Sequence, residues 1–546
     1  MTDPFREHAA WPPVQRRLMG MVFATPLYGP TLLRRRPARL SAAPPDPWPG
    51  NPERGAAITQ GVYSFAGRTV RPEGSPWDET GVEDDWRDCL HGFAWLRDLR
   101  ALGGDPARRH ARTLAEDWLV RHRRWSQVAW RADIAGRRLV SWTSHYELFF
   151  SSAPDPFRGQ LLASAARQAR HLGRTAGREV DGMARLDAIK GLLYAGLCIP
   201  GELPLLARAI RLLGTELPRQ IAADGGHLER SPAVQLRLLR DLVDMRAAMS
   251  AGRQDIPDAL SQAIERAASL LRVFRHGDGG LALFNDSGEG DAAGVDLALS
   301  QANVRRRMPS RAPDTGFERL AAGKLLAIVD TGPPPPTGHA HAGTLSLEVD
   351  FGKERLIVNC GPAARAGPDW RDAARATAAH STLTIEDTNS SDRDGRSPKV
   401  HVERQESDRS IWLTASHNGY AAPFGLVHHR RLYMAAKGDE LRGEDKLVPT
   451  DDARSGAPEN RAFAVRLHLH PDVRASLVQD GAAVLLRLAG GTGWRLRAGG
   501  AKLDLAESIY FGRGGAKRTQ QVVLSGRTAG DGATVKWALR REGGKT

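Results

Sequence analysis

The chain changes its hydrophobic period about halfway along its length. After about residue 85, apolar residues recur at three- and four-residue spacing, and Gly, Pro or Asp residues separate the segments, which predicts successive amphipathic helices. The predicted helical segments are 86–102, 107–124, 160–173, 185–198, 203–222, 233–250 and 257–275. Beyond about residue 320 the period becomes two, as in 344–350, which predicts strands. A helical part therefore precedes a β part.

The same patterns suggest where the parts begin and end. Short apolar runs between Gly-rich turns continue to about residue 540, which favours an antiparallel β-sandwich. The first 80 or so residues are rich in Pro, Arg and Trp and show no sustained period. We predict an irregular arm over 1–84, a helical domain over 85–320 and a β-sandwich domain over 321–546. Periodicity alone permits a bundle, a solenoid or a toroid for the helical domain.

The bulk composition is that of a globular chain. Of the 546 residues, 41% are hydrophobic and 26% charged, and no apolar run reaches the roughly 18 residues that would span a bilayer. We therefore expect no membrane span. The N-terminus shows no basic segment followed by an apolar segment, so a cleavable secretory signal is not visible and a cytoplasmic location is one reading.

The net charge of +14 favours an anionic partner. Guanidinium groups bind carboxylate and sulfate bidentately, which suits an acidic polysaccharide. A solvated Arg-rich surface explains the charge equally well. No basic stretch with interleaved aromatic residues supports nucleic-acid binding, so we expect no nucleic-acid partner.

Two clusters of polar residues carry candidate chemistry. His339 and His341 stand at i and i+2 before an apolar run, and His380 follows later. On an extended segment the first two imidazoles would point to the same side, so a third from a neighbouring strand would complete a metal site or a proton-transfer site. His227 and Glu229 lie about a hundred residues upstream, between two predicted helices, where function often resides.

Together these motifs resemble the heparinase II/III family of polysaccharide lyases. The resemblance runs from about Trp118 to the C-terminus and rests on the segments 224–232, 274–285, 339–351, 416–420 and 468–470. It implies an N-terminal incomplete α/α toroid followed by a C-terminal antiparallel β-sandwich. It also implies cleavage of a uronic-acid polysaccharide by β-elimination, and a periplasmic or cell-envelope location.

The resemblance implies roles for individual residues. His339 would transfer the proton, and Arg230 and Arg275 would neutralise the uronate carboxylate. His227 would assist. The remaining candidates are His276 for catalysis and Glu229, His122, Arg124 and Trp125 for substrate contact, although core packing is the better reading for tryptophans at helical spacing.

The resemblance also implies a zinc site formed by His341, His380 and Asn359. In relatives the third position is commonly Asp. Asn offers an oxygen but no charge, so we expect weaker zinc binding or an empty site.

Two further departures bear on activity. Where the family has an Asn-His pair this chain has Asp181-Gly182, and where it commonly has Tyr-His after Ser-Pro it has Val234-Gln235. The leading hypothesis is a polysaccharide lyase acting on an acidic polymer. The alternative is a catalytically degenerate glycan-binding or cell-envelope protein of the same fold. The sequence leaves the polymer and the oligomeric state open.

Overall fold

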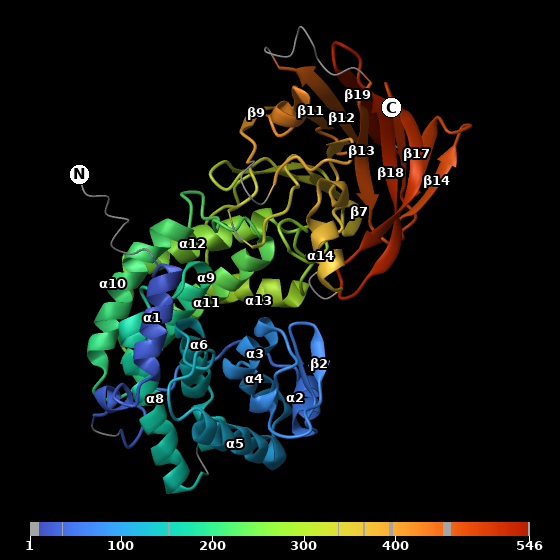
Figure 1. Ribbon diagram of the computed structural model, residues 1–546. Coiled ribbons are helices and arrows are strands. Elements are labelled where there is room, and N and C mark those ends of the chain that lie inside the picture. Colours follow the sequence, from blue (N-terminus) through green and yellow to red (C-terminus); the bar gives the residue numbers. More distant parts are fainter. Residues whose placement is uncertain are drawn as a thin grey trace, which may run out of the picture. The chain divides into compact units, whose positions relative to one another are not determined.

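The computed structural model describes residues 10–34, 37–150, 153–336, 338–363, 366–392, 397–450 and 460–543. The chain forms two compact units (Figure 1). Unit 1 comprises Met1–Gln220 and Arg240–Ala263, and unit 2 comprises Ile221–Leu239 and Ile264–Thr546. The units therefore differ from the predicted segments, because 221–239 and 264–320 belong with the β part. Among the described residues, none of the helices is long and apolar enough to cross a membrane.

Unit 1 is helical. Its helices are α1 Pro13–Ala24, α2 Pro52–Thr59, α3 Asp84–His91, α4 Leu96–Leu102, α5 Gly104–Arg121, α6 Ala132–Ser144, α7 Tyr146–Phe150, α8 Asp155–Thr175, α9 Gly182–Cys198 and α10 Leu203–Gln220. Helices α11 Pro232–Ala251 and α12 Asp258–Val273 are shared with unit 2. The segment predicted to be irregular, 1–84, differs from the prediction, since its described part holds α1, α2 and a hairpin of β1 Tyr63–Phe65 and β2 Arg68–Val70.

Helix α9 is the centre of unit 1. All its residues from Arg185 to Cys198 are buried, and it packs against α6, α8 and α10. Glycines permit the closest approach: a Cβ at Gly191 would lie 2.2 Å from the Cα of Gly136 on α6. Lys190 is buried on the same helix and donates to Asp241 at 2.8 Å and to Asp244 at 2.6 Å, so its charge is compensated.

Unit 2 is a sandwich of two antiparallel sheets. The first sheet has the order β14-β15-β16-β19-β12-β11-β10-β9, and the second β17-β18-β13-β7-β6-β5-β4-β3, with β8 beside β13. The strands are β3 Arg311–Ala312, β4 Phe317–Ala322, β5 Leu325–Asp330, β6 Leu347–Phe351, β7 Glu354–Val358, β8 Leu383–Ile385, β9 Val400–Ser407, β10 Ser410–His417, β11 Leu426–Ala435, β12 Glu440–Pro449, β13 Ala462–Leu469, β14 Arg474–Val478, β15 Ala483–Arg487, β16 Gly493–Gly499, β17 Lys502–Tyr510, β18 Lys517–Arg527 and β19 Ala533–Arg541. Helix α13 Ala292–Ala302 precedes these strands, and two short helices lie between strands, α14 Pro368–Arg375 and α15 Ala421–Phe424.

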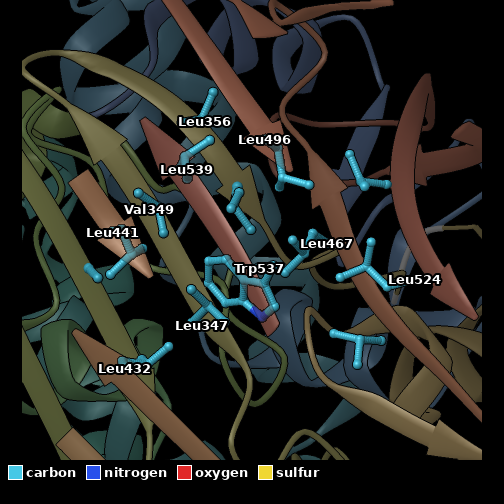
Figure 2. Packing of buried hydrophobic residues seen from close by; sticks show 14 of the residues in the cluster. Leu347, Val349, Leu356, Leu432, Leu441, Leu467, Leu496, Leu524, Trp537 and Leu539 are labelled. Atoms are coloured by element: carbon cyan, nitrogen blue, oxygen red, sulfur yellow. The ribbon is translucent and has the colours of Figure 1, made fainter. Parts of the chain in front are cut away.

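The core of unit 2 lies between the two sheets. Figure 2 shows residues of one sheet, such as Val349 and Leu467, packed against residues of the other, such as Leu441 and Trp537. In β11 and β12 every second residue is buried toward this layer, which explains the period of two in the sequence of such strands. A helical part followed by an antiparallel β-sandwich confirms the predicted fold class.

Candidate functional site

The candidate site lies within unit 2, in loops that precede β6 and β8. His339 occupies the loop before β6, and its side chain is 47% exposed. Its Nδ1 lies 3.4 Å from Oδ2 of Asp286, and its Nε2 lies 3.4 Å from Oε2 of Glu229. The hydrogen bond to Asp286 is the main reason that the pKa of His339 is raised. An accessible imidazole is thus held between two carboxylates.

Asp286 is the centre of this cluster. Asn285 and Asp286 both have left-handed backbone conformations, with φ of 45° and 64°, which Asn and Asp tolerate better than most residues. Burial raises the pKa of Asp286, but hydrogen bonds from His339 and His341 outweigh burial and hold it well below its usual value. Asn285 accepts from the His341 backbone at 3.3 Å and donates to the Arg230 carbonyl at 3.0 Å. The turn therefore joins three distant segments of the chain.

His341 and His380 form a buried pair beside Asp286. Nδ1 of His341 lies 3.1 Å from Nε2 of His380, whose Nδ1 lies 2.8 Å from the Ala376 carbonyl oxygen. Burial lowers the pKa of His341, and burial lowers the pKa of His380 to about 3, so His380 is neutral near pH 7. The prediction that His339 and His341 lie on a strand and point the same way is wrong. They lie in a loop, where one is half-exposed and the other buried.

A cavity of about 470 Å³ opens beside the histidine pair. His341, Asp372, Arg375 and Asn389 are among the residues that line it. Arg375, the last residue of α14, donates to the Gly338 carbonyl at 2.6 Å and lies 3.6 Å from Oδ2 of Asp286. It therefore supplies a cation at the cavity wall and also holds the loop that carries His339.

His227 and Glu229 reach the cluster from the loop before α11. His227 is buried, and burial lowers its pKa to about 4. Gln235, which stands where the resemblance leads us to expect His, accepts from the His227 backbone at 2.9 Å and donates to two carbonyls, those of Gly225 and Ala267. Burial raises the pKa of Glu229. Gln235 therefore holds the loop in shape, and Glu229 is the residue of the loop that contacts His339.

Arg230 is an internal anchor. It is buried, and its guanidinium donates to the carbonyls of Thr315, Gly316 and Pro333 and to the carboxylate of Asp330. Bonds from all three of its nitrogens are directed at protein oxygens. Arg230 was predicted to neutralise a uronate carboxylate, but these contacts give it a structural role. Arg375 is better placed to meet such a carboxylate.

Arg275 and His276 are likewise engaged within the protein. Arg275 pairs with Asp296 at 2.7 Å. His276 is fully buried between Asp350 at 2.7 Å and Glu348 at 2.9 Å. Burial and Arg355 lower the pKa of His276, but the hydrogen bonds to the two carboxylates outweigh them and raise it. The contacts of both residues indicate structural roles.

The predicted zinc ligands come only partly together. His341 and His380 are adjacent, but the Asn359 oxygen accepts from the Ser381 backbone at 2.9 Å and its nitrogen donates to Glu348 at 3.1 Å. Within the described ranges no three His, Cys, Asp or Glu side chains converge on a metal position. Structural zinc sites use four ligands, mostly thiolate and imidazole, so this set does not fit one.

Three of the four predicted substrate contacts, His122, Arg124 and Trp125, belong to unit 1. His122 ends α5, and its ring lies 4.9 Å from that of His91 and 5.3 Å from that of Trp118, centroid to centroid. Burial lowers the pKa of His122 to about 4. Trp125 packs against Phe23 at 5.9 Å, while Arg124 is exposed. The two rings take part in aromatic packing, as the alternative reading of the tryptophans anticipated.

Sequence reasoning missed Asp286 and Arg375. Asp286 follows the 274–285 segment that carried the resemblance, and the polar pair after the apolar run Leu281–Phe284 was a usable signal. Arg375 gave no such signal, because its importance arises from long-range contacts with Gly338 and Asp286.

Comparisons with known proteins agree with this architecture. Residues 76–309 match the family profile described as heparinase II/III N-terminus, and residues 304–538 match that described as heparinase II/III-like, C-terminal. FtsZ-localized protein C of Caulobacter vibrioides is 34% identical over 535 residues, which cover 93% of this chain and 91% of that protein.

Solved structures show the same fold at low identity. A crystal structure of heparinase III has a TM-score of 0.75 at 13% identity and covers 100% of this chain and 94% of its own. Heparan sulfate lyase HepC of Pedobacter heparinus, in a mutant form, has a TM-score of 0.66 at 17% identity, covering 90% and 83%. A Streptomyces coelicolor A3 chondroitin AC lyase in complex with chondroitin sulphate has a TM-score of 0.56 at 12% identity, covering 97% and 83%.

Proposed function

The chain belongs to the heparinase II/III-like family, and from this premise we propose that it binds an acidic, uronic-acid-containing polysaccharide and cleaves it by β-elimination. The observation that supports the proposal is the half-exposed His339, held by Asp286 and Glu229, in the same cluster as Arg375 at the cavity wall. The similar solved structures include lyases of heparan sulfate and chondroitin, which favours this substrate class.

The chemistry requires three operations. The C5–H bond of the uronate breaks and its electron pair forms the C4=C5 double bond, while the C4–O bond breaks and the departing oxygen takes a proton. Neutral His339 accepts the C5 proton and, as imidazolium, gives it to the departing oxygen. Arg375 faces the uronate carboxylate and stabilises the charge that develops next to C5.

This chain lacks the Tyr and the His residues expected from the family, so the proposed proton transfers depend on one imidazole, that of His339. Val234 has no ionisable group, and Asp181 accepts from the Gly182 backbone at 2.9 Å as the N-cap of α9. Val234 cannot transfer a proton as the Tyr expected from the family would, and Gly182 and Gln235 stand where the family has His. His339 therefore has to act as both base and acid, and Asp286 orients it for both steps.

The test is the ultraviolet absorbance of the unsaturated uronate product. Wild type, His339→Ala and the control His401→Ala are incubated with heparan sulfate, chondroitin sulfate and alginate. His401 is exposed on β9, so its loss leaves the cluster intact. We expect product from wild type and the control on at least one polymer and none from His339→Ala. Absence of product on every polymer would overturn the lyase proposal.

A second candidate function follows from the relative that is localised with FtsZ. The 34% identity over nearly the whole length favours association with FtsZ assemblies as the alternative, and the missing Tyr and His favour a non-catalytic role. Co-sedimentation of the purified chain with FtsZ polymers, with wild type and His339→Ala binding equally, would support it. Localisation of a fluorescent fusion would decide between the cell envelope, which the family favours, and the cytoplasm.

A further inference from the structure

A row of side chains crosses five strands on one face of the first sheet of unit 2. In the strand register, Trp412 pairs with Tyr433, Tyr433 with Arg442, Arg442 with Ala538, and Ala538 with Arg497. Directly paired residues of neighbouring strands lie on the same face of a sheet. Neighbouring strands are about 4.8 Å apart, so the four steps extend over roughly 19 Å.

This face points away from the core. The next residues along the strands, Leu413, Leu432, Leu441 and Leu539, are each at most 1% exposed and pack against the other sheet. Leu432, Leu441 and Leu539 are visible in that layer in Figure 2. By the alternation of a strand, the row occupies the opposite, solvent-facing side.

The row and its neighbours form a basic hollow. Its cavity measures about 520 Å³, and small residues such as Gly443 and Ala538 line it. Its charged lining residues are Arg431, Arg442, Glu444, Arg497, Lys536 and Arg540, which are five cations and one carboxylate. The five cations are all exposed. An excess of four positive charges in one hollow favours an anionic ligand.

Existing ion pairs do not block such a ligand. Glu440 accepts from Arg442 at 2.7 Å and from Arg540, and Lys536 lies 3.5 Å from Glu444. The cations of these pairs are exposed to solvent, which weakens an ion pair, so an incoming anion can replace a partner. Within the described part of the chain, Arg431 has no ion pair.

An aromatic pair lies at one end of the row. Trp412 is 41% exposed, and its ring centroid is 4.8 Å from that of Tyr433 with the planes at 62°. The Arg442 guanidinium lies over the Tyr433 ring at 5.1 Å. Exposed large aromatic residues beside polar groups commonly mark binding surfaces. The indole offers an apolar surface for the C–H face of a sugar ring, and the guanidinium groups offer bidentate partners for carboxylate or sulfate.

We infer that this face, defined by Trp412, Tyr433, Arg431, Arg442, Arg497, Lys536 and Arg540, is a non-catalytic binding surface for a carboxylate- or sulfate-bearing polysaccharide. The choice of ligand class rests on the proposed function, whereas the anionic character rests on the face itself. The residues described at the hollow supply cations and aromatic rings for binding, and we infer no cleavage there.

The placement of the row disfavours the other polymers. An extended peptide usually pairs with a sheet edge, and β10, β11, β12, β19 and β16 all have partners on both sides. Single-stranded nucleic acid uses aromatic side chains on which successive bases stack, and here the two rings lie together at one end. A charged sugar chain needs one apolar surface and a line of cations, which is what the row provides.

The experiment measures binding of fluorescent heparan sulfate and alginate oligosaccharides to the full chain by anisotropy at one fixed salt concentration. The variants are Trp412→Ala and the double variant Arg442→Ala with Arg497→Ala. The charge-matched control is Lys517→Ala with Arg518→Ala, which removes two exposed cations from β18 of the other sheet. Neutral dextran and oligo(dT) are run alongside, and circular dichroism verifies folding.

We expect about tenfold weaker binding of at least one anionic oligosaccharide in each test variant and an unchanged Kd in the control. The assay measures binding and not cleavage, so this result stands even if wild type proves to have no lyase activity. Equal affinity in all variants would overturn the inference. Tighter binding of oligo(dT), weakened by the same substitutions, would also overturn it and assign the face to nucleic acid.

Discussion

Two of the imidazole–carboxylate clusters in the described part of unit 2 combine one His, one Asp and one Glu, yet they differ in solvent access. His276 is fully buried, and both of its nitrogens are within 2.9 Å of a carboxylate oxygen, one from Asp350 and one from Glu348. His339 is half-exposed, and its two carboxylate contacts are both 3.4 Å. The first cluster is closed, and the second has room for a further partner.

The difference shows how the fold separates structure from candidate chemistry. A buried charge is tolerated only where it is paired and hydrogen-bonded, and Glu348 is bonded further to the backbones of Leu283 and Asn359. A group that must exchange protons with a ligand needs solvent access and incomplete bonding instead. Only the His339 cluster meets that second requirement, and it has a cavity beside it.

Of the substitutions considered, one in the buried His276 cluster should cause the largest loss of stability. His276→Leu leaves the carboxylates of Glu348 and Asp350 buried without their shared partner. We expect a loss of about 3–5 kcal/mol in the free energy of unfolding, the usual effect of removing one member of a buried pair. Urea denaturation followed by tryptophan fluorescence measures it. With His401→Leu as the control, a loss below about 1 kcal/mol would show that the cluster is not a structural unit.

Unit 1 supplies a carboxyl that contrasts with both clusters. Glu179 is 6% exposed and accepts from the Ala132 backbone at 2.9 Å, and burial raises its pKa from 4.5 to about 7. Because the unfolded chain releases this proton at lower pH than the folded one, its stabilising contribution is present below pH 4.5. It is lost as the pH rises to about 7.

The expected pH-dependent loss from Glu179 is about 3 kcal/mol, and Glu179→Gln should remove it while keeping an acceptor for Ala132. The measurement is the difference in unfolding free energy between wild type and variant at pH 5 and pH 8. A difference that does not change with pH would contradict the assigned pKa.

Two arginines of unit 2, Arg230 and Arg375, extend the comparison. Arg230 is buried among four acceptors, and Lys cannot reproduce a planar fork, so Arg230→Lys should cost about 2 kcal/mol of stability. Arg375→Lys should cost less, because it loses mainly the bond to Gly338, and it should weaken substrate cleavage or binding more. Thermal melts and the product assay on both variants test this. If the two variants changed the melting temperature and product formation to the same extent, the distinction between a structural Arg230 and a substrate-facing Arg375 would be wrong.

Periodicity predicted helices α8 to α12 and the change to strands after about residue 320, and two elements that it missed, β12 and α6, have identifiable physical causes. Strand β12 was not predicted, because Gly443 and Asp445 interrupt the apolar alternation on its inner face. Gly443 makes room for Trp537, since a Cβ there would lie 2.1 Å from the indole ring. Asp445 is bonded to Arg430 and His428. Helix α6 was not predicted, because its buried face includes a charged residue, Arg138, which donates to Gln168 and to two carbonyls.

The sequence predicted only those residues of the site that belong to recognisable motifs. His339, His341, His380, His227 and Glu229 do converge, as their motifs suggested. The sequence could not reveal that the Arg230 guanidinium donates to carbonyls of residues between 315 and 333. The neighbouring sequence does not distinguish a bonded guanidinium from a free one. The assignments of Asp286 and Arg375 needed the contacts themselves.

The open cluster should give the smallest effect on stability and the largest on function. His339→Ala removes a half-exposed side chain with two long contacts, so we expect its unfolding free energy to change by less than about 0.5 kcal/mol. Product formation should disappear, because the only half-exposed imidazole of the cluster is lost. Asp286→Asn, which keeps the shape but removes the charge that orients His339, should retain folding and reduce the rate. If His339→Ala instead destabilised the fold by several kcal/mol, His339 would belong with His276 among the structural histidines, and the proposed chemistry would have no base.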